Sequence, residues 1–237
     1  MPVLSTLRED IDAVFQHDPA ARTTLEVILA YPGLHAIWFY RAANWMWRHD
    51  LKLMGRLVSD FARWITGIEI HPGAKIGRRF FIDHGMGVVI GETAEIGDDV
   101  LLYQGVTLGG TSFKKEKRHP TLEDHVMVSA GAAVIGPVTI GRGSRIGAGA
   151  VVVSSAPPYS TIVGIPGKIV EGERTRADYA ELDHARLPDP VARAMSNLVD
   201  KINQLSIRLE EMEERQDCLE DKIPAPATMS NGAVKEP

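Results

Sequence analysis

Aliphatic residues recur at every sixth position through the middle of the chain. The series occupies thirteen positions: Ile70, Ile76, Ile82, Ile90, Ile96, Leu102, Leu108, Leu122, Val128, Val134, Ile140, Ile146 and Val152. A six-residue period predicts a coil with three short strands per turn, in which each strand points one aliphatic side chain into a shared core and glycine permits the corners. An ordinary β-sandwich with accidental spacing is a poor alternative to so long a series. The period alone fixes neither the handedness of the coil nor the number of chains.

Two interruptions of the series indicate where chemistry could take place. Ile82 and Ile90 are eight residues apart, and the excess contains the sequence Asp-His-Gly. Leu108 and Leu122 are fourteen apart, which we interpret as two repeats plus two extra residues, with the irregular part in residues 109–119. Because an irregularity costs ladder hydrogen bonds, bulges and loops in a repeat are where functional residues usually lie.

The segments that flank the repeat have helical periods. Apolar residues at three- and four-residue steps predict a helical domain over residues 1–66, with breaks at Tyr31-Pro32-Gly33 and Thr66-Gly67. The repeat domain then covers residues 67–170 and a C-terminal extension covers residues 171–237. In the extension, steps of four and three residues join Leu198, Ile202, Leu205, Leu209, Met212, Gln216 and Leu219.

The heptad spacing and the charged residues between its apolar positions predict a short coiled coil over about 195–222. The alternative is an amphipathic helix that lies on the chain's own body. The Pro-, Ala-, Gly- and Ser-rich residues 224–237 are typical of a disordered end.

Composition and charge restrict the classes of function. At 237 residues and 44% hydrophobic content the chain can bury a sizeable core, and a net charge of -5 offers no basic field for nucleic acid. The N-terminus has no signal-peptide pattern, and no apolar run approaches the ~20 residues that span a bilayer. The single cysteine, Cys218, excludes an intrachain disulfide. We therefore expect a cytoplasmic protein that binds neither nucleic acid nor membrane.

His84 is the first candidate for acid–base chemistry. It lies in the first interruption beside Asp83, and histidine is the side chain best matched to taking a proton from a hydroxyl at neutral pH. Glu69 is fifteen residues earlier, close to the eighteen of one coil, so its carboxylate could approach and orient the imidazole. A structural hydrogen bond between His84 and Asp83 is an alternative of equal weight.

The second interruption ends in Arg118 and His119. The planar guanidinium of Arg118 suits a carboxylate, which makes it a candidate clamp for an acidic or amino-acid substrate. His71 and His125 raise the alternative of a zinc site, but the histidines lack close ligand spacing, so we expect no metal.

Several segments together resemble one family. They are IEIHPGAKIG, FIDHGMGVVIGETAEIGDDV, YQGVTLGGT, KRHPTL, GIPGKIV and DPAARTTLEVILAYPGLHAIWFYRAANWMW. From about Leu7 through Val170 the chain resembles serine O-acetyltransferase, which makes O-acetylserine for cysteine synthesis. The resemblance implies an α+β fold in which a helical domain precedes a left-handed parallel β-helix of hexapeptide repeats. It also implies a homotrimer with active sites between neighbouring chains, often paired into a dimer of trimers through the helical domains.

The resemblance implies roles for individual residues. His84 matches the family's general base, and Glu69 matches its carboxylate partner, where many members have Asp. Three further sets are implied: Asp18 and Asp83 at the substrate amino group, Arg118 and His119 at its carboxylate and hydroxyl region, and Gly110, Ala130, Arg145 and Ala148 along the groove for acetyl-CoA.

The expected reaction is direct transfer of acetyl from acetyl-CoA, the co-substrate, to the hydroxyl of L-serine. The alternatives are a hexapeptide acetyltransferase for a sugar or other hydroxyl or amine acceptor, a zinc-dependent hydratase on the same solenoid, and a non-catalytic scaffold. Two departures from the family are visible. The loop TSFKKEKRHP is less glycine-rich, and the chain ends in Pro237 instead of the isoleucine with which members bind O-acetylserine sulfhydrylase. We therefore do not expect that partner to bind in the usual way.

Overall fold

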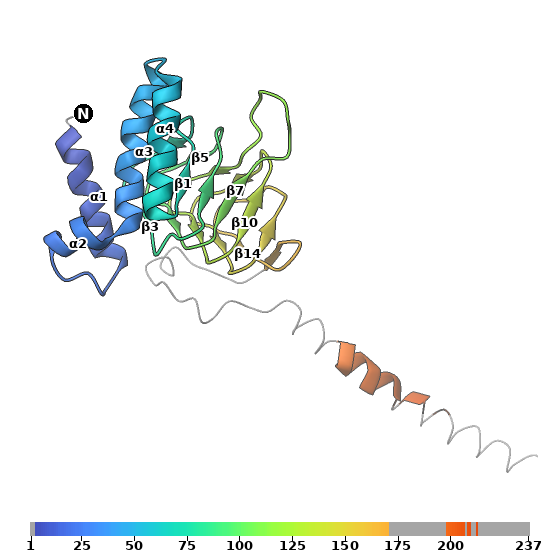
Figure 1. Ribbon diagram of the computed structural model, residues 1–237. Helices are drawn as coiled ribbons and strands as arrows, with labels where there is room; N and C mark the ends of the chain where they lie inside the picture. Colours follow the sequence, from blue (N-terminus) through green and yellow to red (C-terminus); the bar gives the residue numbers. More distant parts are fainter. Residues whose placement is uncertain (1–2, 171–197, 207, 210–211, 213–237) are drawn as a thin grey trace, which may run out of the picture. The chain divides into compact units, whose positions relative to one another are not determined.

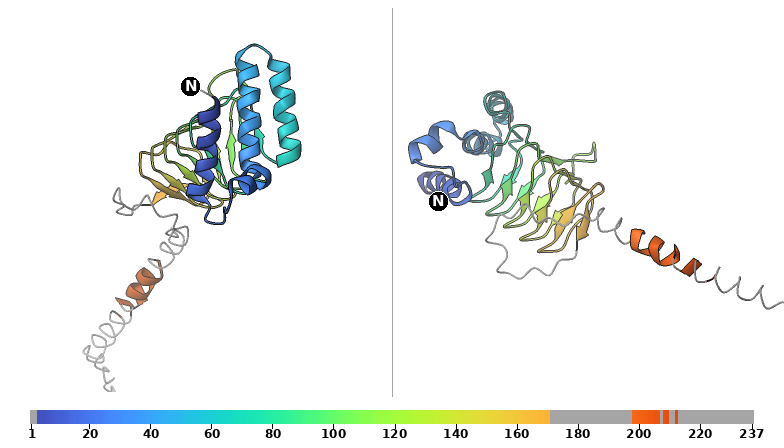
Figure 2. Two further views of the ribbon diagram at one scale, coloured as in Figure 1. Left: turned by 90° about the vertical axis from the view of Figure 1, so that its left-hand side faces the viewer. Right: turned by 90° about the horizontal axis from the view of Figure 1, so that it is seen from below.

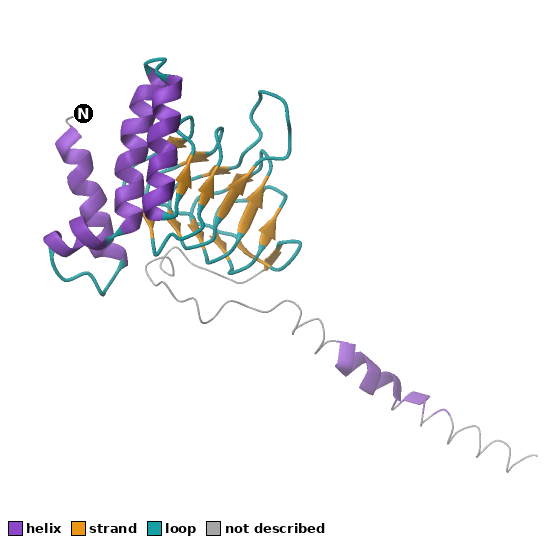
Figure 3. Cartoon of the chain, viewed as in Figure 1, coloured by secondary structure: helices purple, strands orange, loops and turns teal. Residues whose placement is uncertain are grey.

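The structure is a computed structural model that describes residues 3–170, 198–206, 208, 209 and 212. The chain forms two compact units, residues 1–188 and residues 189–237. In the first unit, helices pack beside a solenoid of short strands (Figures 1 and 3).

The N-terminal part consists of four helices: α1 (Val3–His17), α2 (Thr24–Ala30), α3 (Pro32–Arg48) and α4 (Lys52–Thr66). Thr23 caps α2, because its side-chain oxygen accepts a hydrogen bond from the Glu26 amide at 3.2 Å. Pro32 begins α3, at a position where no amide donor is needed. Gly67 ends α4 in the left-handed conformation, with φ at 71°. The predicted helix breaks are confirmed.

Helix α4 packs through small residues and exposes large ones. Its buried residues are Gly55, Ser59, Ala62 and Thr66. Ser59 Oγ donates to the Ile70 carbonyl at 2.7 Å, and a Cβ on Gly55 would lie 2.9 Å from the Ala43 oxygen. The large apolar side chains of the same helix are exposed: Leu53, Met54, Leu57, Phe61, Trp64 and Ile65. The small residues therefore let α4 approach its neighbours closely, while its large apolar residues stay exposed among the residues that the structure describes.

The repeat folds into a three-sided solenoid of parallel strands. The first sheet contains β1 (Glu69–Ile70), β4 (Val89–Ile90), β7 (Thr107–Gly109), β10 (Ala133–Ile135) and β13 (Val151–Val152). The second contains β2 (Lys75–Ile76), β5 (Glu95–Ile96), β8 (Thr121–Leu122) and β11 (Thr139–Ile140). The third contains β3 (Phe81–Ile82), β6 (Leu101–Leu102), β9 (Met127–Val128), β12 (Arg145–Ile146), β14 (Thr161–Val163) and the antiparallel β15 (Lys168–Val170).

We name the corners by the sheets that they join. The first corner leads from the first sheet to the second, the second corner from the second to the third, and the third corner from the third sheet back to the first. Each complete coil passes all three corners (Figure 2).

The predicted aliphatic ladder forms the core. In the first sheet, Ile70, Ile90, Leu108, Val134 and Val152 are paired in register from coil to coil. All thirteen positions of the series are buried except Ile76, which is partly buried and packs against the same cluster. The hexapeptide solenoid predicted from the sequence is confirmed.

Helix α3 covers the N-terminal end of this core. Its residues Ala36, Ile37 and Tyr40 belong to the same buried cluster as the ladder, and the Tyr40 hydroxyl donates to the Ala74 carbonyl at 2.8 Å. The apolar core at the first coil is therefore covered by a helix and not by another coil (Figure 2).

A second apolar cluster fixes the other helices on the outer face of the third sheet. Val14, Val27 and Leu34, from α1, α2 and α3, pack against Phe81, Leu101 and Met127. Because α1 and α2 lie on this face, the segment that joins them is held near the third corner.

The second interruption differs from our prediction. Leu108 and Leu122 lie in β7 and β8, which are consecutive strands of one coil with no strand between them. The spacing is therefore one repeat plus eight extra residues, and our interpretation as two repeats plus two was wrong. The physical reason is that the sixth residue after Leu108 is Lys114, whose charge is unfit for the apolar interior. The excess forms a loop that stands out from the coils, green in Figure 1.

The second unit contains a helix in residues 198–206, and residues 208, 209 and 212 are also helical. The heptad positions described there are exposed: Leu198, Ile202, Leu205, Leu209 and Met212. Gln216, Leu219, Cys218 and the predicted disordered end lie outside the described residues, so the coiled coil stays a prediction. No helix in the described part of the chain is long and apolar enough to cross a membrane.

Replacing Leu108 with alanine is expected to lower the free energy of unfolding by about 2–5 kcal/mol, because it removes a fully buried rung of the ladder and leaves a cavity. Urea denaturation at fixed protein concentration measures the change. The control is Val153→Ala, at a side chain that is 54% exposed, with an expected change within about 0.5 kcal/mol. Equal effects of the two substitutions would contradict the ladder as the source of stability.

Candidate active site

The third corner of the first coil presents His84 to solvent. The His84 backbone has φ at 57°, its side chain is 74% exposed, and Nε2 lies 4.0 Å from Asp83 Oδ1. The next residue, Gly85, is buried with φ at 85°, and a Cβ there would lie 2.4 Å from Ile68 Cδ1. Only glycine fits this sharp turn, which directs the imidazole away from the core.

Asp18 reaches the same corner through Tyr31. The Tyr31 hydroxyl donates to Asp18 Oδ2 at 2.6 Å, and the Ala20 amide donates to Asp18 Oδ1 at 2.7 Å. Burial, the hydrogen bond to Asp18 and the charges of nearby carboxylates including Asp83 raise the pKa of Tyr31 to about 12. Burial also raises the pKa of Tyr103, with Asp83 as the second cause. Two carboxylates and two phenols therefore share this corner, a combination suited to a cationic group.

A glycine brings the helices close enough to form this cluster. Gly33 lies in the first turn of α3, where a Cβ would be 2.1 Å from the Ile82 carbonyl oxygen. Ile82 directly precedes Asp83, so the close approach sets Tyr31 beside the corner. Neither tyrosine was predicted from the sequence, although Tyr31 lies in the Tyr-Pro-Gly break and Tyr103 begins the segment YQGVTLGGT.

Glu69 lies on β1 next to this corner and is bonded elsewhere. In the parallel register it pairs with Val89, five residues after His84. Its Oε2 accepts a hydrogen bond from Arg63 Nη1 at 2.9 Å, across the end of α4. The structure thus places Glu69 on β1, which pairs with the strand that follows the His84 corner, but the carboxylate contacts Arg63 rather than the imidazole.

Arg118 and His119 lie at the first corner, where the loop returns to the second sheet. Arg118 Nη2 pairs with Glu92 Oε2 at 2.6 Å, and this hydrogen bond lowers the pKa of Glu92. His119 is only 8% exposed, and burial followed by the charge of Arg118 lowers its pKa. A Cβ on Gly91, one coil below, would lie 2.0 Å from the imidazole Cδ2. The imidazole therefore occupies space that only glycine leaves free.

The loop before these residues is held to the coil. Lys117 Nζ donates to the Thr93 carbonyl at 2.7 Å and lies 3.6 Å from Glu95 Oε2. Ser112 Oγ donates to Glu116 Oε1 at 2.9 Å. The last residues of the loop thus have fixed positions, and their contact residues Glu92 and Thr93 were not predicted from the sequence.

One chain does not bring all the predicted residues together. Asp18, Asp83 and His84 lie at the third corner, whereas Arg118 and His119 lie at the first. The strands of the first sheet separate the two corners.

The residues predicted for acetyl-CoA also divide between corners. Gly110 is exposed at the start of the loop, and a Cβ there would lie 3.1 Å from His119 Nε2. Ala130 and Ala148 occupy the third corner in successive coils, joined by the hydrogen bond from the Gly149 amide to the Ala130 carbonyl at 2.9 Å. Ala130 and Ala148 therefore place only small side chains along the third corner, the same corner at which His84 lies in the first coil.

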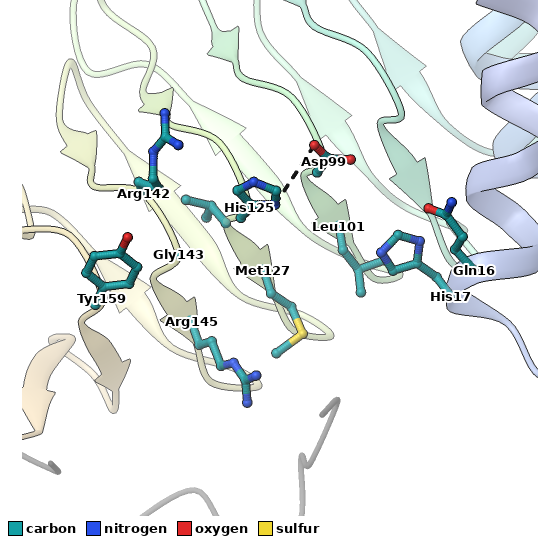
Figure 4. Close-up of a pocket in the computed structure, with 11 residues that line it drawn as sticks. Gln16, His17, Asp99, Leu101, His125, Met127, Arg142, Gly143, Arg145 and Tyr159 are labelled. Carbon is teal, nitrogen blue, oxygen red and sulfur yellow. Dashed lines mark ion pairs between the residues drawn. The ribbon is translucent and has the colours of Figure 1, made fainter. Parts of the chain in front are cut away.

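Arg145 lies on β12 and lines a cavity of about 440 Å³ on the outer face of the third sheet (Figure 4). The side chains around it are Gln16, His17, Asp99, Leu101, His125, Val126, Met127, Arg142, Arg145 and Tyr159. Its charged groups are partly paired, since Arg142 contacts Asp124 at 2.7 Å and His125 lies 3.9 Å from Asp99. Basic side chains still line much of this cavity.

The two histidines that raised a metal site lie apart. His71, at the first corner, accepts a hydrogen bond from the Gly73 amide at 3.0 Å, and burial lowers its pKa to about 4. His125 lies at the second corner. Among the residues that the structure describes, no group of three His, Cys, Asp or Glu side chains could hold a metal ion.

Two family models match the chain: "Serine acetyltransferase, N-terminal" over residues 2–38 and "Bacterial transferase hexapeptide (six repeats)" over residues 119–154. The serine acetyltransferase of Bacillus subtilis is 55% identical over 211 residues, which cover 88% of this chain and 96% of the relative. The chain belongs to the serine acetyltransferase family. The Bacillus licheniformis member is 56% identical over 215 residues, which cover 90% of this chain and 98% of the relative.

Solved serine acetyltransferase structures share the fold. The Vibrio cholerae structure matches with a TM-score of 0.74 at 37% identity, over 77% of this chain and 71% of that chain. The Neisseria gonorrhoeae structure in complex with serine gives 0.68 at 36% identity, over 71% and 69%. The Brucella abortus structure in complex with coenzyme A gives 0.69 at 38%, over 70% and 67%. The family, fold class and acyltransferase class predicted from the sequence are confirmed.

Gly91→Ala is expected to lower kcat/KM by ~10-fold or more, since the new Cβ displaces the His119 imidazole and a shift of about 1 Å at a reacting group can cost ~10²-fold. Thiol release from acetyl-CoA with L-serine as acceptor measures it. The matched control is Gly73→Ala at the same corner one coil earlier, where the Cβ approaches no atom closer than 3.2 Å. Full activity of Gly91→Ala would show that the position of His119 is unimportant.

Proposed function

We propose that this chain transfers the acetyl group of acetyl-CoA to the hydroxyl of L-serine, with His84 as the general base. The observation that carries the proposal is the exposed His84 imidazole beside the Asp83 carboxylate, with Tyr31 under the influence of both Asp83 and Asp18. Family membership and the relatives solved with serine and with coenzyme A support the same substrates.

The corner can bind an amino acid in one orientation. Asp18 and Asp83 attract the ammonium group of serine, which sets its hydroxyl toward His84 Nε2. The neutral imidazole takes the hydroxyl proton as the oxygen attacks the thioester carbonyl carbon, so that a C–O bond forms while a proton moves to the ring. The C–S bond of the tetrahedral intermediate then breaks, and the proton on His84 passes to the departing thiolate of CoA.

Glu69 is the proposed carboxylate partner of His84. It now pairs with Arg63, whose side chain is 56% exposed, and a surface ion pair of this kind contributes little stability. Exchanging Arg63 for the imidazolium that forms during transfer therefore costs little. The charge of Glu69 would then stabilise the protonated ring.

A neighbouring chain supplies the second half of the site in this proposal. Arg118 and His119 lie across the first sheet from His84 of the same chain, but the first corner of another chain can approach the third corner. A cyclic trimer repeats this contact three times and closes. Arg118, already held by Glu92, offers its remaining N–H groups to the serine carboxylate. Separately, the exposed apolar residues of α4 suit a further pairing of two trimers.

Acetyl-CoA would lie along the third corner. Ala130 and Ala148 leave room for the pantetheine arm, and Gly110 of the neighbouring chain bounds the groove near the thioester. The guanidinium of Arg145, in the basic cavity beside this corner, suits the phosphates of CoA.

His84→Ala is expected to lower kcat by ~10²- to 10⁴-fold while acetyl-CoA binding stays intact, which is the usual share of a general base. Free thiol release, followed with L-serine, homoserine and an amino sugar as acceptors, measures rate and acceptor choice together. Calorimetric binding of CoA is the control. Near-normal turnover of the variant would remove the mechanism, and a strong preference for the amino sugar would favour a sugar acetyltransferase.

Mixing two inactive variants tests whether each site is shared between chains. His84→Ala and Arg118→Ala chains, unfolded and refolded together at equal amounts, are expected to recover about a quarter of the wild-type activity, because one site in four then combines an intact His84 with an intact neighbouring Arg118. The doubly substituted chain, treated alike with wild type, is the matched control. No recovery from correctly assembled mixtures would place both residues in the site of a single chain.

A further inference from the structure

The side chain and backbone of Thr93 contact the end of the loop at five points. Thr93 Oγ1 accepts hydrogen bonds from the backbone amides of Arg118 at 3.0 Å and His119 at 3.1 Å. Oγ1 also lies 2.9 Å from His119 Nδ1, and the Thr93 amide lies 3.2 Å from the same nitrogen. The fifth contact is from Lys117 Nζ to the Thr93 carbonyl. Thr93 thus holds His119 and the end of the loop in place.

These contacts determine which ring nitrogen carries the proton. A backbone amide can only donate, so the Thr93 N–H requires a lone pair on His119 Nδ1. The Thr93 hydroxyl oxygen already accepts from two amides, which leaves its own hydrogen for Nδ1. Both donors therefore demand an unprotonated Nδ1, and the proton of the neutral ring lies on Nε2.

The surroundings favour the neutral ring. A doubly protonated imidazolium would direct its Nδ1–H at the Thr93 amide hydrogen, and the charges of Arg118 and Lys117 oppose it, while Glu92 favours it. Burial is the largest cause of the lowered pKa of His119. Because its pKa is lowered, the His119 ring stays neutral to a lower pH than an ordinary histidine side chain.

The other edge of the ring faces the backbone of two glycines. A Cβ on Gly91 would lie 2.1 Å from His119 Nε2 and one on Gly110 would lie 3.1 Å from it. Within the described residues, the hydrogen bonds found for the ring are all at Nδ1. The two glycines thus keep the Nε2 edge clear of side chains at the start of the exposed loop.

From this geometry we infer that Thr93 is a positioning residue, which holds His119 as a neutral hydrogen-bond donor through Nε2–H and prevents it from acting as a base. The inference rests on the proposed function for its reactants. The donor would bind an anionic oxygen of the reactants in the shared site, either the carboxylate of the acceptor or the oxyanion of the tetrahedral intermediate. The two histidines then divide the work: His84 takes the proton, and His119 stabilises negative charge.

Neutron diffraction from crystals of the perdeuterated protein at neutral pH tests the tautomer directly. The expected result is a deuteron on Nε2 of His119 and none on Nδ1. A deuteron on Nδ1 would overturn the inference, whether or not His84 is the base. Because the measurement needs no substrate, its failure is distinct from failure of the proposed function.

Kinetics of Thr93 variants test the consequence. Thr93→Val keeps the backbone amide but removes the hydroxyl, and it is expected to lower kcat/KM for serine by ~10- to 100-fold, the usual effect of losing a group that orients a functional imidazole. Thr93→Ser restores the hydroxyl and should stay within about threefold of wild type. A rise in KM for serine would identify the carboxylate as the bound oxygen, and a fall in kcat alone would identify the oxyanion; an unchanged Thr93→Val would contradict the inference.

Lys117→Met separates orientation from loop anchoring. It removes the contact of Lys117 Nζ with the Thr93 carbonyl and leaves both contacts to Nδ1 in place. We expect its kcat/KM to stay within about threefold of wild type. If Lys117→Met lost as much activity as Thr93→Val, the role of Thr93 would be to hold the loop, and the tautomer argument would fall.

Discussion

The inward ladder of aliphatic side chains is the constraint on which the rest of the structure depends. Each two- or three-residue strand is too short to be stable alone, so it persists only because its backbone pairs with the coils on either side while its aliphatic residue fills the core. Apolar residues fill the interior of the solenoid, so polar side chains lie at its corners and on its outer faces. The position of the proposed catalytic residues at corners is therefore a consequence of the core.

The ladder and the corner of His84 could be predicted because they depend on local spacing. The six-residue period is visible in the sequence of a single chain, and an eight-residue step cannot be one regular repeat. The step from Leu108 to Leu122 was predicted wrongly, since fourteen residues can hold either a further strand or a long loop. The charge of Lys114 at the would-be inward position was the signal that could have distinguished them.

Contacts that depend on packing between distant segments could not be predicted. The bond between Glu69 and Arg63 arises because α4 ends beside β1, and the seat of His119 on Thr93 joins residues 26 apart on neighbouring coils. The helical period predicted over residues 1–66 also did not show that the large apolar residues of α4 would be exposed and that Gly55 and Ser59 would pack instead. Helical spacing reveals that an apolar face exists but not what packs against it.

The loop of residues 110–120 does not alter the strand register of the coils on either side of it. Leu108 and Leu122 remain neighbouring rungs, paired above and below with aliphatic residues of ordinary coils. Such an excursion can grow, shrink or change composition over evolutionary time without any compensating change in the core. The segment that ends in Arg118 and His119 could thus be exchanged as a unit, with the remainder of the fold intact.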